Sequence, residues 1–167
     1  GLLPLDLKTF TVHEFLDDLK DNIPADWLKR DVVLGWNVPT VPIILRSDRG
    51  KLKKVLRNLV QNAFKFTERG SVTVTAAVDH SWVEFSVTDT GIGISAESLP
   101  VIFDMFRQVD GSSTRRHGGV GLGLYIVKQL VRALGGEVGV TSTVGAGSTF
   151  QLRLRRGDAK AWEASAV

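Results

Sequence analysis

Two stretches of alternating apolar residues constrain the fold more than any other feature of this 167-residue sequence. Valine or alanine occupies every second position over residues 72–78, and valine or phenylalanine does so over residues 83–87. Such alternation is typical of a strand with one buried face. The polar residues 79–81, Asp-His-Ser, are suited to a turn between the two stretches. The segment therefore predicts an antiparallel β-hairpin whose apolar face must be covered by other parts of the chain.

Amphipathic helices are suited to cover that face. Thr11, with Glu14 three residues later, forms a capping box that predicts a helix reaching about Asn22. Asp48 is the predicted N-cap of a longer helix that ends near Phe66 and carries an apolar stripe. Further strands are predicted over residues 5–8, 32–36, 42–45, 137–142 and 149–155, and further helices over residues 96–102 and 121–134. The expected fold class is α+β, a two-layer sandwich in which about three helices cover one face of a mixed, mostly antiparallel sheet.

Composition narrows the function classes. The chain is 43% hydrophobic and 23% charged, which is typical of a globular domain, and its net charge of +3 is lower than dedicated nucleic-acid binders carry. It has no cysteine for disulfides or thiolate metal sites, and no apolar run or signal peptide that would suit a membrane span or export. We expect a single cytoplasmic domain over residues 1–156 and a disordered tail over residues 157–167. Because the chain starts at Gly1 and its only methionine is Met105, we also expect it to be part of a larger protein.

The long predicted helix carries an unusual polar stripe. Asn58, Asn62 and Lys65 have i, i+4 and i+7 spacing, so they lie on one side of the helix beside its apolar face. Asparagine is a poor residue for a helix interior, because its side chain competes for backbone hydrogen bonds. One interpretation is a solvated edge of an amphipathic helix. The other is a ligand set, in which an amide oxygen binds Mg²⁺ and the ammonium group binds phosphate.

Asp89 continues the alternation of the second strand and therefore points to the same side as its apolar residues. An ionised carboxylate is costly at such a position unless other groups satisfy it. Thr90-Gly91-Ile92-Gly93 follows, and its glycines would let the backbone approach a ligand closely. The pattern fits either ligand recognition or a strand-end aspartate that opens a glycine turn.

A glycine-rich segment, Gly-Gly-Val-Gly-Leu-Gly-Leu at residues 118–124, leads directly into an apolar helix. Free N–H groups and the positive end of the helix dipole suit a phosphate at such a position. The spacing differs from that of a P-loop. It also differs from a Rossmann turn, because a polar loop over residues 104–119 precedes it in place of a strand.

Five blocks of the sequence together carry a family resemblance. They are NLVQNAFKFT (58–67), DTGIGI (89–94), IFDMFRQVD (102–110), GGVGLGLYIVKQL (118–130) and GAGSTF (145–150). They resemble the N, G1, F, G2 and terminal glycine boxes of sensor histidine kinases and occur in that family's order. The resemblance covers about residues 5–155, and five boxes in order are specific where one box is weak evidence.

This resemblance implies the Bergerat fold, with ATP and Mg²⁺ as cofactors. Residues 104–119 would form a lid over the nucleotide, anchored by Phe103 and Phe106. The residues implied to contact ATP are Asn58, Asn62, Lys65, Asp89, Gly91, Gly93, Ile94, Phe106, Gly119, Val120, Gly121, Leu122, Gly123, Leu124 and Thr149.

The resemblance also implies individual roles. Asp89 would accept a hydrogen bond from the adenine amino group, and Thr149 would lie near the same base. Asn62 would ligate Mg²⁺, and the catalytic pair Asn58 and Lys65 would support the metal site and neutralise phosphate charge.

Asn58 distinguishes the histidine kinases from related ATPases that share these boxes. ATPases of the gyrase, Hsp90 and MutL type have a glutamate there that activates water, whereas asparagine is a poor general base. A phosphotransferase is therefore favoured over an ATPase, which remains an alternative.

The nucleophile would be a histidine on a separate dimerisation domain. His13 lacks the sequence that surrounds a phosphoacceptor in the family, His80 lies at the tip of the predicted hairpin and His117 lies in the predicted lid. That domain is therefore expected outside this chain. The expected partners are ATP, this domain and, indirectly, a response regulator, with the isolated domain a monomer. Val120 stands where the family often has threonine, which keeps open a non-catalytic module that senses ATP or docks partners.

Overall fold

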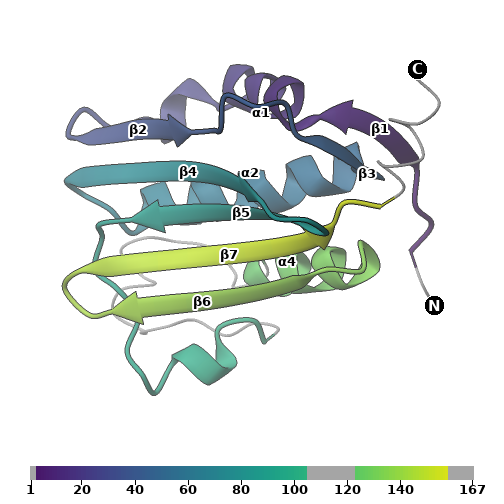
Figure 1. Ribbon diagram of the computed structural model, residues 1–167. Coiled ribbons are helices and arrows are strands. Elements are labelled where there is room, and N and C mark those ends of the chain that lie inside the picture. Colours follow the sequence, from purple (N-terminus) through teal and green to yellow (C-terminus); the bar gives the residue numbers. More distant parts are fainter. Residues whose placement is uncertain (1–2, 105–122, 158–167) are drawn as a thin grey trace.

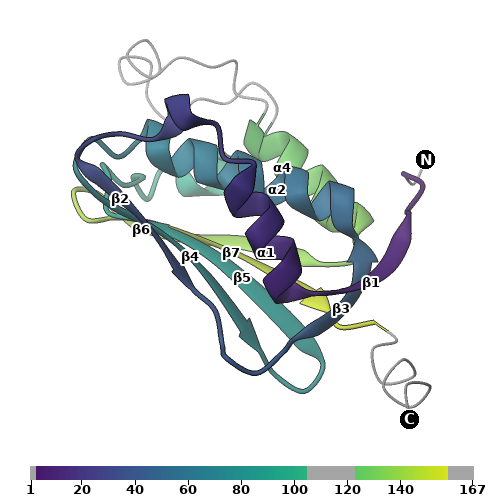
Figure 2. The same cartoon turned by 90° about the horizontal axis from the view of Figure 1, so that it is seen from above.

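The computed structural model describes residues 3–104 and 123–157. In this part of the chain a five-stranded sheet is covered on one face by three α-helices, and the other face is uncovered (Figures 1 and 2). The helices are α1 (Val12–Asp21), α2 (Arg49–Lys65) and α4 (Gly123–Ala133). The strands, in the order in which they lie side by side, are β2 (Val32–Asn37), β4 (Gly70–Val78), β5 (Trp82–Asp89), β7 (Gly147–Arg155) and β6 (Glu137–Thr143). The predicted two-layer α+β class is confirmed.

The predicted hairpin is formed by β4 and β5, which pair antiparallel with Val78 opposite Val83. Its turn is closed by the Asp79 carboxylate, whose Oδ1 accepts hydrogen bonds from the backbone N–H groups of Ser81 (3.2 Å) and Trp82 (2.8 Å). The β5–β7 and β7–β6 pairs are also antiparallel, whereas β2 lies parallel to β4. The sheet is therefore mixed and mostly antiparallel, as predicted.

Alternation along the strands separates the two faces of the sheet. In β5, Val83, Phe85 and Val87 are buried under the helices, whereas Ser86 and Thr88 lie half-buried on the uncovered face. The helical layer contacts this core through aromatic rings: Phe15 of α1 meets Phe85 edge to face, with 6.0 Å between the ring centroids. The apolar pattern that predicts the hairpin thus also determines which face the helices cover.

Two short strands form a separate sheet, in which β1 (Leu7–Thr11) pairs antiparallel with β3 (Ile44–Asp48). Both strands begin two residues later and end three residues later than the sequence predicts. The reason is that each strand runs directly into a helix, so its last residue is also the N-cap of that helix.

Both predicted caps are present. The Thr11 hydroxyl accepts a hydrogen bond from the N–H of Glu14 (3.2 Å), and Asp48 Oδ1 accepts one from the N–H of Lys51 (3.0 Å). Side-chain oxygens of this kind satisfy N–H groups that the first turn of a helix leaves unpaired.

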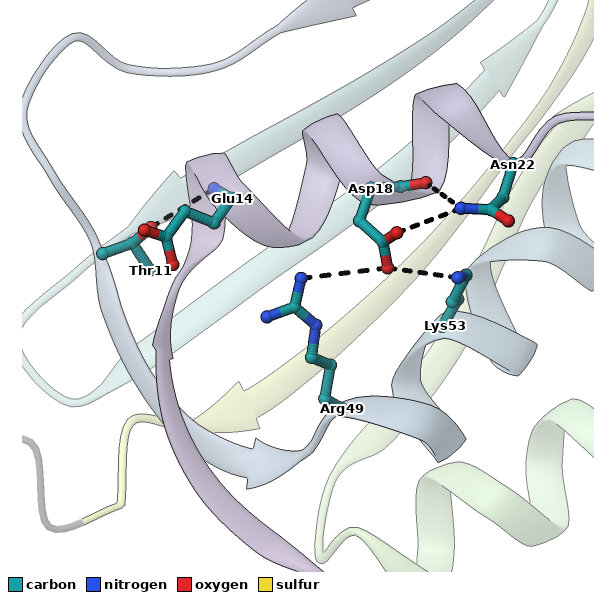
Figure 3. A network of polar contacts seen from close by, with 6 residues as sticks. All are labelled: Thr11, Glu14, Asp18, Asn22, Arg49 and Lys53. Atoms are coloured by element: carbon teal, nitrogen blue, oxygen red, sulfur yellow. Dashed lines mark hydrogen bonds and ion pairs between the residues drawn. The ribbon is translucent and has the colours of Figure 1, made fainter.

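Charged side chains join α1 to α2 (Figure 3). Asp18 Oδ2 lies 3.1 Å from Lys53 Nζ and 3.8 Å from Arg49 Nη2, and Asn22 Nδ2 donates to Asp18 Oδ1 at 3.0 Å. These contacts hold α1 beside the first half of α2.

Two short 3₁₀ helices complete the described elements. The first, η1 (Ala25–Trp27), is absent from the sequence prediction. The second, η2 (Leu99–Val101), replaces the longer helix predicted over residues 96–102, because Pro100 has no N–H group and restricts the residue before it. The predicted lid, apart from Asp104, and the predicted tail beyond Gly157 lie outside the described residues. Among the helices that are described, none has the length and apolarity needed to cross a membrane.

Candidate functional site

Asp89 is a buried carboxylate at the end of β5 and on the covered face of the sheet. Its side chain is only 6% exposed, and its Oδ1 accepts a hydrogen bond from the N–H of Gly91 at 2.9 Å. Burial raises the pKa of the Asp89 carboxyl above its ordinary value, and the backbone hydrogen bonds from Gly91 and Ser148 offset part of that rise. Two N–H donors leave the carboxylate with free acceptor positions, so the group can still bind a donor on a ligand.

The loop after Asp89 is held against the end of α2 and against the β6–β7 turn. The N–H of Ile92 donates to Phe66 O at 3.1 Å, and the carbonyl of Ile92 accepts from the N–H of Gly145 at 2.8 Å. A Cβ at Gly91 would lie 2.1 Å from Phe66 O, and one at Gly93, where φ is +76°, would lie 2.2 Å from Thr143 O. Only glycine allows this close packing, so both predicted glycines of the loop have a structural requirement.

Asn58, the first residue of the polar stripe of α2, faces the N-terminal end of α4. Asn58, Asn62 and Lys65 are all half-buried on α2. The position that a Cβ would take on Gly123, the first residue of α4, lies 3.8 Å from Asn58 Oδ1. The structure thus brings Asn58 next to Gly123, where the end of the glycine-rich segment begins α4. Leu124, the next residue of α4, is half-buried and packs against the core.

The structure places Thr149 away from Asp89. Thr149 is on the uncovered face of the sheet, where its hydroxyl lies 3.1 Å from the hydroxyl of Thr88. The residue opposite Asp89 in the β5–β7 register is Ser148, which is buried and lies on the covered face. Ser148 is therefore the residue of the terminal glycine box that shares a site with Asp89.

Ser142 of β6 fixes this corner of the site. Its hydroxyl donates to Gly147 O at 2.9 Å and accepts from the N–H of Ile94 at 2.7 Å, and it lies 2.8 Å from the Ser148 hydroxyl. The predicted site residue Ile94 is thus held to β6 beside Ser148. Sequence reasoning missed both serines. A signal for Ser148 was available, because it alternates in step with the buried residues Phe150, Leu152 and Leu154 of β7.

Phe103, a predicted lid anchor, packs against the core. It is the residue before Asp104, where the first described range ends. Its ring meets Phe150 edge to face at 6.1 Å, and Lys128 Nζ of α4 lies 5.9 Å from the Phe103 ring centroid. The other predicted site residues, Phe106, Gly119, Val120, Gly121 and Leu122, lie outside the described residues.

The described residues contain no group of three or more histidine, cysteine, aspartate or glutamate side chains that could hold a metal ion by themselves. Mg²⁺ does not need such a group, because it is commonly bound through one or two protein oxygens together with phosphates of a nucleotide and water. Asn62, the predicted metal ligand, is half-buried on α2.

Comparison with protein families gives one match over most of these elements. Residues 47–158 match the family described as histidine kinase-, DNA gyrase B- and HSP90-like ATPases. The match includes α2, β4, β5, α4, β6 and β7.

Curated relatives with similar sequences include a sensor protein and a histidine kinase. The chain is 38% identical over 161 residues to the sensor protein GacS of Pseudomonas syringae pv. syringae, an alignment that covers 93% of this chain and 18% of that protein. It is 37% identical over 153 residues to the peroxide stress-activated histidine kinase mak2 of Schizosaccharomyces pombe, with 86% of this chain and 7% of that protein covered. The chain therefore spans less than a fifth of the length of these relatives.

Solved structures with the same fold include two histidine kinases. Full-length ShkA in complex with AMPPNP matches with a TM-score of 0.81 and 34% identity, over 92% of this chain and 32% of that chain. The catalytic domain of histidine kinase ThkA, in a nucleotide-free form, matches with a TM-score of 0.77 and 24% identity, over 90% of this chain and 96% of that chain. The fold is that of histidine kinase catalytic domains, the expected Bergerat fold.

Proposed function

The chain belongs to the family of histidine kinase-, DNA gyrase B- and HSP90-like ATPases, and on this basis we propose that it is the catalytic ATP-binding domain of a sensor histidine kinase. In this role it binds Mg·ATP and donates the γ-phosphoryl group to a histidine of a separate dimerisation domain. Because the relatives are much longer than this chain, the phosphoacceptor domain and a response regulator are proposed as partners outside it. A nucleotide of this kind is taken from the cytoplasm, so we place the domain there.

The observation that carries the proposal is the buried carboxylate of Asp89. It lies on the covered face of the sheet, and its two backbone donors leave acceptor positions free. The amino group of adenine supplies the donor that such a carboxylate lacks. Within the binding site, Asp89 therefore recognises the base and Ser148 lies beside it.

The triphosphate then extends from Asp89 toward the polar stripe of α2 and the start of α4. Asn58 lies next to Gly123 at the start of α4, and Lys65 is the cation of the stripe. The N-terminal end of α4, beginning at Gly123, adds free N–H groups and the positive end of a helix dipole. These groups position and neutralise the phosphates, which is what phosphoryl transfer requires of a protein.

Asn62 is the residue that would hold Mg²⁺, through its amide oxygen, together with oxygens of the phosphates. The bound ion would neutralise negative charge on the phosphates during transfer.

Asn58 favours transfer of the phosphoryl group over hydrolysis of ATP. A side-chain amide has no basic group at neutral pH, so Asn58 cannot remove a proton from water. The bond between the γ-phosphorus and the β–γ bridging oxygen breaks when an imidazole nitrogen of the acceptor histidine attacks. ADP leaves with the bridging oxygen, and phosphohistidine is formed.

The test combines the chain with the phosphoacceptor domain of its own parent protein and with ATP labelled at the γ-phosphate. We expect label on a histidine of the acceptor domain with the wild-type chain and none with Asp89→Asn. Asp17→Asn is the matched control, because Asp17 is an exposed residue of α1 and is not among the residues assigned to the site. Binding of Mg·ATP by calorimetry is measured in parallel. Nucleotide binding without histidine phosphorylation would refute the kinase assignment, and steady release of phosphate by the chain alone would favour an ATPase.

A further inference from the structure

The face of the sheet that the helices leave uncovered has an uncharged centre (Figure 2). One row of residues that lie opposite one another across four strands consists of Thr73, Thr88, Thr149 and Thr141. The adjacent row on the same face consists of Thr75, Ser86, Gln151 and Gly139. Neither row contains a charged side chain. Depletion of charged residues is a mark of the centre of protein–protein interfaces.

An aromatic and cationic cluster borders these rows at the end of the sheet farther from Asp89. Trp82, the first residue of β5, is half-buried and lies opposite Arg155 of β7. The guanidinium carbons of Arg153 and Arg155 each lie 4.8 Å from the Trp82 ring centroid. Tryptophan and arginine are the residue types that most often dominate the binding energy of an interface. Contact with the ring also restrains two long side chains, which reduces the entropy that they lose when a partner binds.

The two arginines of the cluster differ in their contacts. Arg153 lies between two carboxylates, with Nη2 3.6 Å from Asp79 Oδ2 and Nε 3.6 Å from Glu84 Oε2, and Glu137 is its neighbour on β6. The contact that the structure gives to Arg155 is the Trp82 ring, and its side chain is exposed. Arg155 therefore presents a restrained guanidinium group to solvent. Such a group suits a carboxylate, which can accept two parallel hydrogen bonds from it.

An anionic membrane suits this surface less well. Segments that bind membranes combine several lysines or arginines with apolar side chains that insert between the lipids. Here two guanidinium groups lie over the Trp82 ring, and one of them is already paired with carboxylates. The uncharged rows beside the cluster are polar and low, which favours a protein surface as the occupant.

We propose that the uncovered face of the sheet docks a partner protein, which covers the two uncharged rows and places an aspartate or glutamate carboxylate against Arg155 beside Trp82. This surface is on the opposite side of the sheet from the buried Asp89 carboxylate and shares no residue with the proposed catalytic pair. The inference therefore goes beyond phosphoryl transfer and does not depend on it.

The test uses a synthetic ten-residue peptide with three glutamates, and a second peptide with glutamines in their place, as probes of the surface. Each is titrated into the isotope-labelled chain at low ionic strength, where charge screening is weak, and backbone and indole N–H signals are followed by NMR. The glutamate peptide is expected to shift the Trp82 indole signal and signals of the two uncharged rows, and the glutamine peptide is not. Arg155→Gln should weaken binding about tenfold, the factor typical of a lost hydrogen bond to a charged group.

Matched variants separate recognition from net charge. Arg132→Gln removes the same charge from an exposed position of α4 and should bind the glutamate peptide as the wild-type chain does. Trp82→Leu keeps Arg155 but removes the ring that restrains it, and should also weaken binding. The NMR spectrum of each variant reports whether it is folded.

Three results would overturn the proposal: no shift with the glutamate peptide, equal shifts with both peptides, or equal affinity of wild type and Arg155→Gln. Binding to vesicles that contain phosphatidylserine, lost in Arg155→Gln and without any peptide binding, would identify a membrane as the partner and also overturn it. ATP binding is measured on the same samples. A chain that binds ATP but not the peptide overturns the docking surface alone, and one that binds the peptide but not ATP overturns the proposed function alone.

Discussion

Asp89 shows how one residue can favour binding at the expense of folding. Its carboxylate is buried on the apolar side of the sheet, and two backbone N–H groups only partly compensate for the lost hydration. We predict that Asp89→Asn abolishes detectable ATP binding and leaves the free energy of unfolding unchanged or higher. The amide keeps an oxygen that can accept from Gly91, but it removes a charge that is costly to bury. Calorimetry and urea unfolding of the two proteins measure these effects, and a variant with near-normal ATP affinity would contradict the assignment.

The stability effect of the Asp89 carboxyl should depend on pH. Because burial raises its folded pKa, the carboxyl favours the folded state most below its unfolded pKa, and this contribution is lost as pH rises through the folded pKa. The stability advantage of Asp89→Asn is therefore expected at pH 7 and should disappear below about pH 4, where both side chains are neutral. Urea unfolding across this range measures the difference. An advantage that stays constant with pH would show that ionisation of Asp89 is not its cause.

Other residues show how far the sequence predicts a site. Alternation along β5 correctly places Asp89 on the covered face, and the same count along β7 would have selected Ser148 before Thr149. The close packing of Thr67 against Gly91 could not be predicted, because it joins two segments that are far apart along the chain. Periodicity indicates the side of an element on which a residue lies, but contacts between distant segments need the fold.

At the scale of elements, the N-terminal end of α2 is fixed by Asp48, which is 4% exposed. Its carboxylate accepts hydrogen bonds from the backbone N–H groups of Lys51 (3.0 Å) and Asp6 (3.0 Å), and it pairs with Lys51 Nζ at 2.9 Å. We predict that Asp48→Ala lowers the free energy of unfolding by about 2 kcal/mol, because it removes a cap and leaves partly buried donors unpaired. Urea unfolding at pH 7 measures the loss.

The effect of Asp48 should also have the opposite pH dependence to that of Asp89. Burial alone would raise the pKa of Asp48, but its hydrogen bonds with Asp6 and Lys51 and the Lys51 charge together lower it below the ordinary value. Its contribution is therefore present above the unfolded pKa and is lost as pH falls through the folded pKa. Asp18→Ala is the control: Asp18 is a helix residue with a 38% exposed side chain, and its ion pairs are expected to contribute at most about 1 kcal/mol. Equal losses for the two variants would contradict the importance of the α2 cap.

The elements that sequence predicts well are those with a local signal. Thr11 and Asp48 mark the starts of α1 and α2 because capping is a contact over three residues. The 3₁₀ helix η1 has no comparable cap, and Arg57 of α2, which lies 5.4 Å from the Trp27 ring centroid, shows that tertiary packing holds it. The separation of β1 and β3 into their own sheet likewise depends on pairing between distant segments.

At the scale of the whole molecule, the site draws on both layers and on distant parts of the chain. The sheet contributes Asp89 and Ser148, and the helical layer contributes the polar stripe of α2 and the start of α4. Figure 2 shows α2 and α4 on one face of the sheet. Backbone hydrogen bonds from Ile92 to Phe66 and from Gly145 to Ile92 connect the layers at this point. A ligand that contacts both layers adds further links between them and should stabilise the domain as a unit.

This gives a prediction for the intact domain. Free Mg·ATP at 100 times its Kd is expected to raise the free energy of unfolding by about 2.7 kcal/mol, since only the folded chain binds it. For a domain of this size the melting temperature should rise by about 5–10 °C. Asn62→Ala should lose the part of this shift that depends on Mg²⁺, so that adding EDTA changes the melting temperature of the ATP-bound wild-type chain but not that of the variant. Gln61→Ala, at the neighbouring exposed position of α2, serves as the control and should respond as the wild-type chain does. If Asn62→Ala keeps the full Mg²⁺-dependent shift, the metal is held by other residues, and the assignment of Asn62 is wrong.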